Sequence, residues 1–166
     1  MKKFILIIHL QIFFSLSSCL YAQKTLVEKD SVLDFLIDKV KLNAPDLLEN
    51  DLSNVKFQSR TYLGHIISPD SVVIFRLVLS EIYLKNGAKS GKLLVFGPDE
   101  FLGFYEMNLN YSKKVMNHKF LVFDIPRENN KIFKRRVYLS EGLPNTFEVE
   151  GHHLQFIRHT PFLSEE

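Results

Sequence analysis

The sequence predicts a mainly β fold, an antiparallel β-meander or partly closed barrel with an amphipathic helix near the N-terminus. Residues 92–111 alternate between two faces around a turn, as a β-hairpin does. Short apolar segments separated by Gly, Pro and Asn follow to the C-terminus, which is typical of further strands. If residues 72–84 formed a helix, the class would become α+β with a smaller sheet.

The hairpin is predicted to turn at residues 97–100. Pro98 fixes φ near the value that the second position of a turn requires, and Asp99 suits the next position. On the outgoing strand, one face collects alternate residues: Phe101, Gly103, Tyr105, Met107, Leu109 and Tyr111. This face is expected to point into a core that is rich in phenylalanine, because the chain has 15 Phe and no Trp.

Residues 1–22 are expected to be a signal peptide, and residues 23–166 a single globular domain. Lys2 and Lys3 precede an apolar run that ends at Leu16, and this run is shorter than the ~20 residues of a membrane-spanning helix. The protein is therefore expected to be exported, to the periplasm or to the medium. Without its leader the chain has 19 basic and 19 acidic residues, so no general affinity for nucleic acid is indicated.

Two sites of processing fit this leader. We prefer cleavage after Ala22, which has the small side chain that signal peptidase favours. The alternative rests on Leu16, Ser17, Ser18 and Cys19, which resemble the lipobox of bacterial lipoproteins. That resemblance implies lipidation of Cys19 and a membrane contact through the lipid anchor alone. Cys19 is the only cysteine, so no disulfide is expected.

Upstream of the hairpin, a helix is predicted to begin at Asp30 or Ser31, to carry an apolar stripe through Val40 and to stop at residues 43–45. A helical turn is expected at residues 46–49 and an edge strand at residues 55–62. Residues 72–84 read as a buried central strand, bulged near Ser80, because they begin with β-branched and aromatic side chains. Residues 86–91 would be the loop that follows.

Downstream, residues 112–119 are expected to be a polar connection, 120–125 a strand, 128–130 a turn, 132–140 a strand and 141–145 another turn. In the last hairpin, Gly151 and His152 would be the central residues of a type II′ turn. The predicted pairs are Val149 with Leu154, Phe147 with Phe156, Glu150 with His153, and Glu148 with Gln155.

The histidines do not predict a metal site or another cofactor. His153 and His159 are six residues apart on one predicted strand, about 20 Å at ~3.3 Å per residue, too far for one ion. Glu150 and His153 are the weak candidates, although a cross-strand charge pair is the simpler interpretation. His65 and His118 are interpreted as isolated. The sequence has no Gly-x-Ser-x-Gly motif and no phosphate-binding loop, so an enzyme is not favoured.

A basic segment is the clearest hint of a partner. Residues 113–136 contain two acids and eight basic residues: Lys113, Lys114, Lys119, Arg127, Lys131, Lys134, Arg135 and Arg136. These could form a patch for an anionic glycan, a lipid headgroup or an acidic protein, although ordinary solvated positions are the favoured interpretation. Arg135 is in phase with Phe133 and Val137, so it is expected at the sheet margin or against a buried carboxylate.

We therefore expect an exported domain of the cell envelope, most simply a non-enzymatic module that binds a ligand or protein or has a structural role. One alternative is a small β-barrel carrier of an apolar ligand, since roughly eight strands suffice to close around one small molecule. Another is an inhibitor of an enzyme that acts on envelope polymers, or, less favoured, such an enzyme itself.

Overall fold

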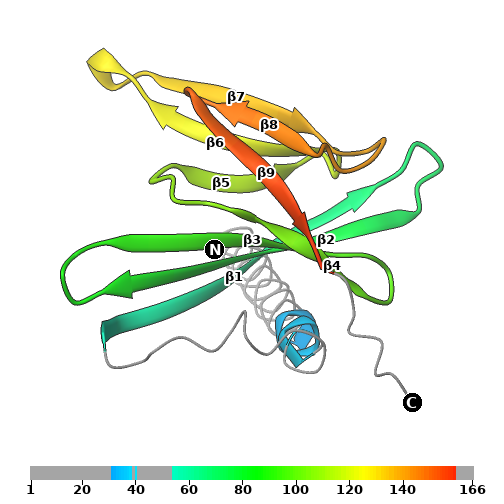
Figure 1. Ribbon diagram of the computed structural model, residues 1–166. Helices are drawn as coiled ribbons and strands as arrows, with labels where there is room; N and C mark the ends of the chain where they lie inside the picture. Colours follow the sequence, from blue (N-terminus) through cyan, green and yellow to red (C-terminus); the bar gives the residue numbers. More distant parts are fainter. Residues whose placement is uncertain (1–30, 39, 41–53, 160–166) are drawn as a thin grey trace, which may run out of the picture.

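The described part of the chain folds into two antiparallel β-sheets and one helix (Figure 1), which confirms the mainly β class. The computed structural model describes residues 31–38, 40 and 54–159. The predicted signal peptide, Cys19 and the predicted turn at 46–49 lie outside the described residues.

The larger sheet has six strands, in the spatial order β1 (Val55–Ile67), β2 (Val73–Leu84), β3 (Lys89–Phe96), β4 (Phe101–Glu106), β9 (His152–Arg158) and β8 (Thr146–Val149). The smaller sheet has the order β5 (Ser112–Met116), β6 (Phe120–Pro126) and β7 (Ile132–Tyr138). A short 3-10 turn, η3 (Glu128–Asn130), joins β6 to β7. Strand pairing leaves these two sheets separate in the described part of the chain, so a closed barrel is not formed.

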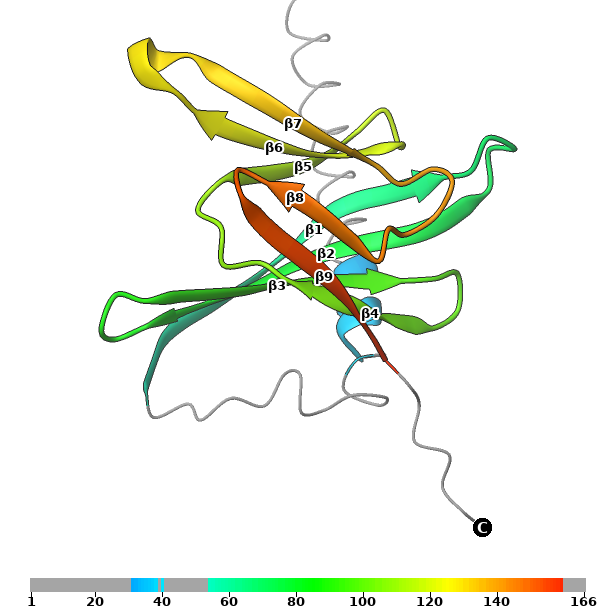
Figure 2. The same ribbon diagram turned by 45° about the horizontal axis from the view of Figure 1, so that its top comes forward.

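The core lies between the two sheets. Alternate residues of β2, β3 and β4, such as Leu77, Val95 and Tyr105, face Leu121 and Phe123 of β6, and all five are at most 1% exposed. Figure 2 shows β8 and β9 running obliquely from the smaller sheet down to β4. Strand β9 approaches β4 closely at Gly103, where φ is +143° and a Cβ atom would overlap the carbonyl of Ile157.

The helix covers the opposite face of the larger sheet (Figure 1). Residues 31–38 and 40 are helical, as predicted, and the apolar stripe buries Leu36, Ile37 and Val40. These side chains pack against Val78 of β2 and Leu94 of β3, which lie side by side in the sheet. The larger sheet is therefore covered on both faces, which explains why the middle of β2 is apolar rather than alternating.

The predicted central hairpin is confirmed. Phe96 pairs with Phe101 across the turn, and the Gly97 N–H donates a hydrogen bond to the Glu100 carbonyl at 2.8 Å. Burial alternates from Phe101 to Leu109 as expected, although strand β4 itself ends at Glu106.

Residues 73–84 form strand β2, so the helical alternative for residues 72–84 is wrong. The bulge expected near Ser80 is wrong as well, because Ser80 pairs regularly with Arg60 and with Lys92. A bulge lies instead in the neighbouring edge strand β1, which is longer than predicted and reaches Ile67. The following loop is shorter than predicted, since β3 begins at Lys89.

Residues 112–116 form strand β5, so the expectation of a polar connection there is wrong. The strand has few apolar residues because one lysine, Lys113, is buried where the alternation calls for an apolar side chain.

The last hairpin exists, but its predicted register is wrong by two residues. Val149 pairs with His152 and Phe147 with Leu154, so the two turn residues are Glu150 and Gly151, with φ of 52° and 78°. Two positive φ values indicate a type I′ turn. A shift of two residues keeps every side chain on the same face of the hairpin. The division of side chains between the core face and the solvent face is therefore identical in the two registers and does not distinguish them.

Candidate functional site

A recess of about 480 Å³ opens where edge strand β1, the helix at Val32 and the β5–β6 turn meet. Its described walls combine apolar and polar side chains from four separate segments of the chain. They are Val32, Tyr62, Leu63, Gly64, His65, Val73, Arg76, Val115, Asn117 and His118.

The recess is shaped by the bulge in β1. Tyr62 pairs with Val78 and Gly64 pairs with Leu77, so Leu63 is the extra residue. Gly64 has φ of +131°, and a Cβ atom there would lie only 3.2 Å from Cβ of Val115 in β5. The glycine therefore allows the smaller sheet to approach the edge of the larger one.

Two hydrogen bonds hold this junction between the sheets. The Ile67 N–H donates to the His118 carbonyl at 2.8 Å, and the Ser140 hydroxyl donates to the Ile67 carbonyl at 2.8 Å. Asn117 and His118 both have positive φ, 53° and 52°, which tightens the β5–β6 turn and brings the His118 ring to the rim of the recess.

His65 and His118 are not isolated, contrary to the sequence interpretation. Their rings stack with centroids 4.4 Å apart and planes inclined by 17°. Burial, followed by the charges of His118 and Arg76, lowers the pKa of His65 below its usual value. His65 is therefore neutral at pH 7 and becomes charged only in more acidic solution.

Arg76 gives the recess its permanent positive charge. It lies directly opposite His65 on the neighbouring strand. Its Nη1 donates to the carbonyls of Gly97 and Pro98, at 3.3 and 3.1 Å, which fixes the guanidinium beside the central hairpin turn. Burial raises the pKa of the Tyr62 hydroxyl, partly offset by Arg76, so this hydroxyl stays protonated and can donate a hydrogen bond. None of the described lining residues is an acid.

The described residues contain no group of three or more His, Cys, Asp or Glu side chains arranged for a metal ion. His65 and His118 present their faces to each other, whereas metal ligands must point ring nitrogens at one ion. The Glu150–His153 pairing expected from sequence is not formed. His153 lies opposite Glu148, while the Glu150 carboxylate pairs with Arg127 at 2.6 Å.

A second recess of about 470 Å³ lies between the β3–β4 turn and the end of β9. Its described walls include Glu100, Arg158 and His159 beside the phenyl rings of Phe75, Phe101 and Phe156. Because acid and base are both present, this recess does not have the uniformly positive character of the first.

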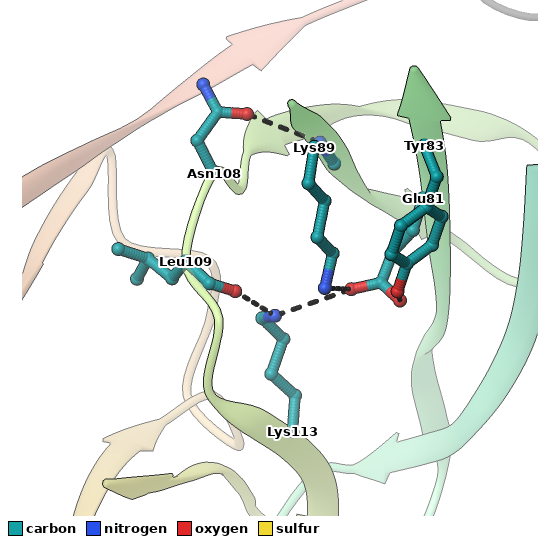
Figure 3. Close-up of polar contacts among 7 residues, drawn as sticks. Glu81, Tyr83, Lys89, Asn108, Leu109 and Lys113 are labelled. Carbon is teal, nitrogen blue, oxygen red and sulfur yellow. Dashed lines mark hydrogen bonds and ion pairs between the residues drawn. The ribbon is translucent and has the colours of Figure 1, made fainter. Parts of the chain in front are cut away.

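The eight predicted basic residues do not form a single patch. Lys113 is 7% exposed and points between the sheets (Figure 3), where its Nζ donates to the Leu109 carbonyl at 2.7 Å and lies 3.7 Å from the Glu81 carboxylate. Burial lowers the pKa of Lys113, partly offset by Glu81. The same carboxylate pairs with Lys89 at 2.7 Å and accepts a hydrogen bond from Tyr83 at 3.3 Å.

The other seven basic residues, Lys114, Lys119, Arg127, Lys131, Lys134, Arg135 and Arg136, are exposed on the smaller sheet and its turns. Lys114 pairs with Asp124 at 2.6 Å. Arg135 is exposed at the sheet margin, where its Nε donates to the Glu148 carbonyl at 3.2 Å, so the buried-carboxylate alternative is wrong.

Comparison with known proteins finds no matching family model, no matching curated protein and no matching solved structure. No described helix has the length and apolar character needed to span a membrane. The class of protein is defined by its fold and site: in the residues that the structure describes, a mainly β domain of two antiparallel sheets and one helix, with a positively charged recess at the edge of the larger sheet.

Sequence reasoning missed the recess because its residues are distant in the chain. One local signal was available, since a glycine inside a strand pattern, as at Gly64, is typical of a bulge or of a close approach by another segment. The partner segment, with Asn117 and His118, carried no signal that pointed to Gly64.

Proposed function

We propose that the protein is an exported, non-enzymatic binding module that holds a small amphipathic anion in the recess beside β1. The observation that carries this proposal is the lining, which combines Arg76, two imidazoles and a tyrosine hydroxyl with aliphatic walls and has no acid among its described residues. Such a mixture of apolar surface and a few convergent polar groups is typical of small-ligand sites.

The polar groups are suited to a carboxylate or another small anion. The His65, Asn117 and His118 side chains and the Tyr62 hydroxyl make no hydrogen bond within the described residues, so these groups are available to a ligand. Arg76 supplies charge that does not depend on pH, and His65 adds charge on protonation. Val32, Leu63, Val73 and Val115 would contact the apolar part of the ligand.

Calorimetric titration with octanoate tests the recess, with octanol and octylamine as neutral and cationic probes of similar length. We expect octanoate to bind most tightly, and more tightly at pH 5.5 than at pH 8, because a protonated His65 strengthens its hydrogen bond to an anion. His65→Phe keeps a ring stacked on His118 and removes one donor, so it should weaken octanoate binding by roughly 10- to 100-fold, as loss of a hydrogen bond to a charged group does.

His153→Phe is the matched control, since His153 is an exposed imidazole on β9 that does not line the recess. It should leave octanoate binding unchanged. Equal affinity for octanoate, octanol and octylamine would show that the recess does not select anions. Absence of binding by all three would refute the assignment of the ligand site.

Export is tested by native mass spectrometry of the protein purified from its own host. A chain that begins at Gln23 supports cleavage after Ala22 and a periplasmic or secreted module, whereas a lipidated chain that begins at Cys19 supports a lipoprotein anchored to the envelope. A full-length chain with residues 1–22 intact would contradict both. Any molecule retained in the same spectrum identifies the natural ligand directly.

A partly closed barrel is the finer description of the fold that we propose. Hydrogen bonds join the two sheets at both pairs of neighbouring edges. One runs from Arg135 of β7 to the carbonyl of Glu148 in β8, and the other runs from Ile67 of β1 to the carbonyl of His118 in the β5–β6 turn. The space between the sheets is filled by side chains such as Leu77, Leu93 and Phe123, each 0% exposed. This filling is why we place the ligand in the edge recess, although the apolar-carrier alternative would place it inside the barrel.

A further inference from the structure

We propose that the β6–β7 hairpin binds the surface of an anionic lipid bilayer. The hairpin comprises β6, the turn η3 and β7, and its turn projects beyond the body of the domain in both views (Figures 1 and 2). This surface is separate from the recess beside β1, and the inference does not depend on the ligand proposed there.

The first observation is apolar exposure on an edge strand. Strand β7 is an edge of the smaller sheet, and Ile132, Phe133 and Tyr138 are 61%, 48% and 42% exposed. Ile132 and Phe133 are the first residues after the projecting turn, so their side chains are at the part of the hairpin that an approaching flat surface meets first. Ile132 and Phe133, one on each face of this edge, are therefore the apolar side chains exposed side by side, and such exposure at an edge is typical of a binding surface.

The second observation is the charge around these side chains. The hairpin, residues 120–138, carries five basic residues and two acids, a net charge of +3. Lys131, Lys134 and Arg136 are exposed and form no ion pair within the described residues. Lys134 lies opposite Asp124, but that carboxylate is already held by Lys114 at 2.6 Å.

Arg127 links the apolar and basic parts of the hairpin. Its Nη2 pairs with Glu150 at 2.6 Å, and its guanidinium carbon lies 5.5 Å from the centre of the Phe133 ring. The Arg127 N–H also donates to the Lys131 carbonyl at 2.8 Å, which closes the turn. The exposed Phe133 ring is therefore held in place at the base of the turn.

The combination favours a bilayer over the other anionic partners. The basic residues alone would suit a glycan or an acidic protein as well, but Ile132 and Phe133 beside them add apolar surface that gains by entering the boundary between headgroups and acyl chains. Cations beside such side chains are attracted to anionic headgroups, each by about 1 kcal/mol.

Cosedimentation with vesicles tests the inference, using the protein isolated from its own host. Vesicles that mix phosphatidylcholine with anionic phosphatidylglycerol are compared with vesicles of pure phosphatidylcholine. We expect binding to the anionic vesicles that weakens with added salt. A triple variant, Lys131→Gln, Lys134→Gln and Arg136→Gln, should bind on the order of 100-fold more weakly.

One further variant separates the apolar contribution to vesicle binding from that of the basic residues, and another is a control. Ile132→Ser with Phe133→Ser should weaken binding while its salt dependence persists, because the cations are unchanged. Lys56→Gln, at an exposed lysine of β1, is the control and should bind like the unmodified protein. All variants are at exposed positions, so circular dichroism should show the native fold.

Three outcomes would overturn the inference. They are absence of binding to the anionic vesicles, binding that neither hairpin variant weakens, and binding to heparin or polyaspartate that matches the vesicles and is insensitive to Ile132→Ser with Phe133→Ser. The last outcome would assign the surface to a glycan or an acidic protein.

Discussion

Glu81→Gln is expected to destabilise the protein strongly, because one carboxylate serves two lysines between the sheets (Figure 3). Glu81 Oε1 lies 2.7 Å from Nζ of Lys89 and 3.7 Å from Nζ of Lys113, and these side chains are 14%, 19% and 1% exposed. Removing one partner of a buried ion pair costs about 3–5 kcal/mol. The amide would leave two ammonium groups together without a counter-ion, so we expect about 3 kcal/mol or more.

Lys113→Met is expected to cost less, about 1–2 kcal/mol. It leaves the Leu109 carbonyl without its donor, a loss of about 1–3 kcal/mol. It also removes a charge that burial disfavours, which offsets part of that loss. Glu81 keeps Lys89 and Tyr83, so no carboxylate is left without a partner.

Urea unfolding at pH 7 measures these free energies, and an unchanged m-value shows that the same surface is exposed on unfolding. Lys114→Met is the matched control, since its ion pair with Asp124 is exposed on the lysine side and worth less than about 1 kcal/mol. The reasoning is refuted if Lys113→Met costs as much as Glu81→Gln, or if Lys114→Met costs as much as either.

Three other changes test the fold and the recess. Gly103→Ala should cost more than about 2 kcal/mol in urea unfolding, because φ is +143° and the new Cβ would overlap the Ile157 carbonyl of β9; stability within about 0.5 kcal/mol of the native protein would show that β9 does not lie there. Leu77→Ala should cost about 2–5 kcal/mol, since the side chain is 0% exposed between the sheets, and a cost below about 1 kcal/mol would contradict that burial. Because the pKa of His65 is lowered in the folded protein, the unfolded chain binds a proton at this imidazole more tightly, and the free energy of unfolding should fall as pH decreases from 6.5 toward the pKa of the folded state. His65→Phe should flatten this part of the profile of stability against pH. A profile unchanged by the substitution would contradict the assigned shift.

Local patterns predicted most of the strands, because alternation and turn residues act within a few positions of each other. The central hairpin is the best example, since Pro98 and the alternation from Phe101 to Leu109 both depend on short-range geometry. Strand β5 was missed because Lys113 occupies a core position, and a buried lysine is predictable only if its partner Glu81, on β2, is known to face it. Pairing across long sequence separations carries no local signal.

The register of the last hairpin shows a different limit. Both registers place Phe147, Val149 and Leu154 on the core face, so burial does not choose between them. The conformation of the turn determines the register, because Glu150 adopts φ of 52° beside Gly151 and its carboxylate pairs with Arg127, directly after β6 of the smaller sheet. A glutamate in this conformation costs free energy, and the ion pair, whose Arg127 side chain is 50% exposed, offsets part of that cost. The turn is therefore stabilised by a residue from another strand pair, and that partner is absent from any local interpretation of the sequence.

The candidate site likewise depends on contacts between residues that are far apart in the sequence. His65 and His118 come from different sheets, and their contact exists because Gly64 has no Cβ and lets β5 approach β1. Gly64→Ala should therefore separate the imidazoles and abolish octanoate selectivity even where the sheets stay folded. Each residue taken alone is an ordinary surface position, and only the approach of the two sheets makes a recess with one sign of charge. The function we propose thus depends on how the sheets meet and not on any motif within one strand.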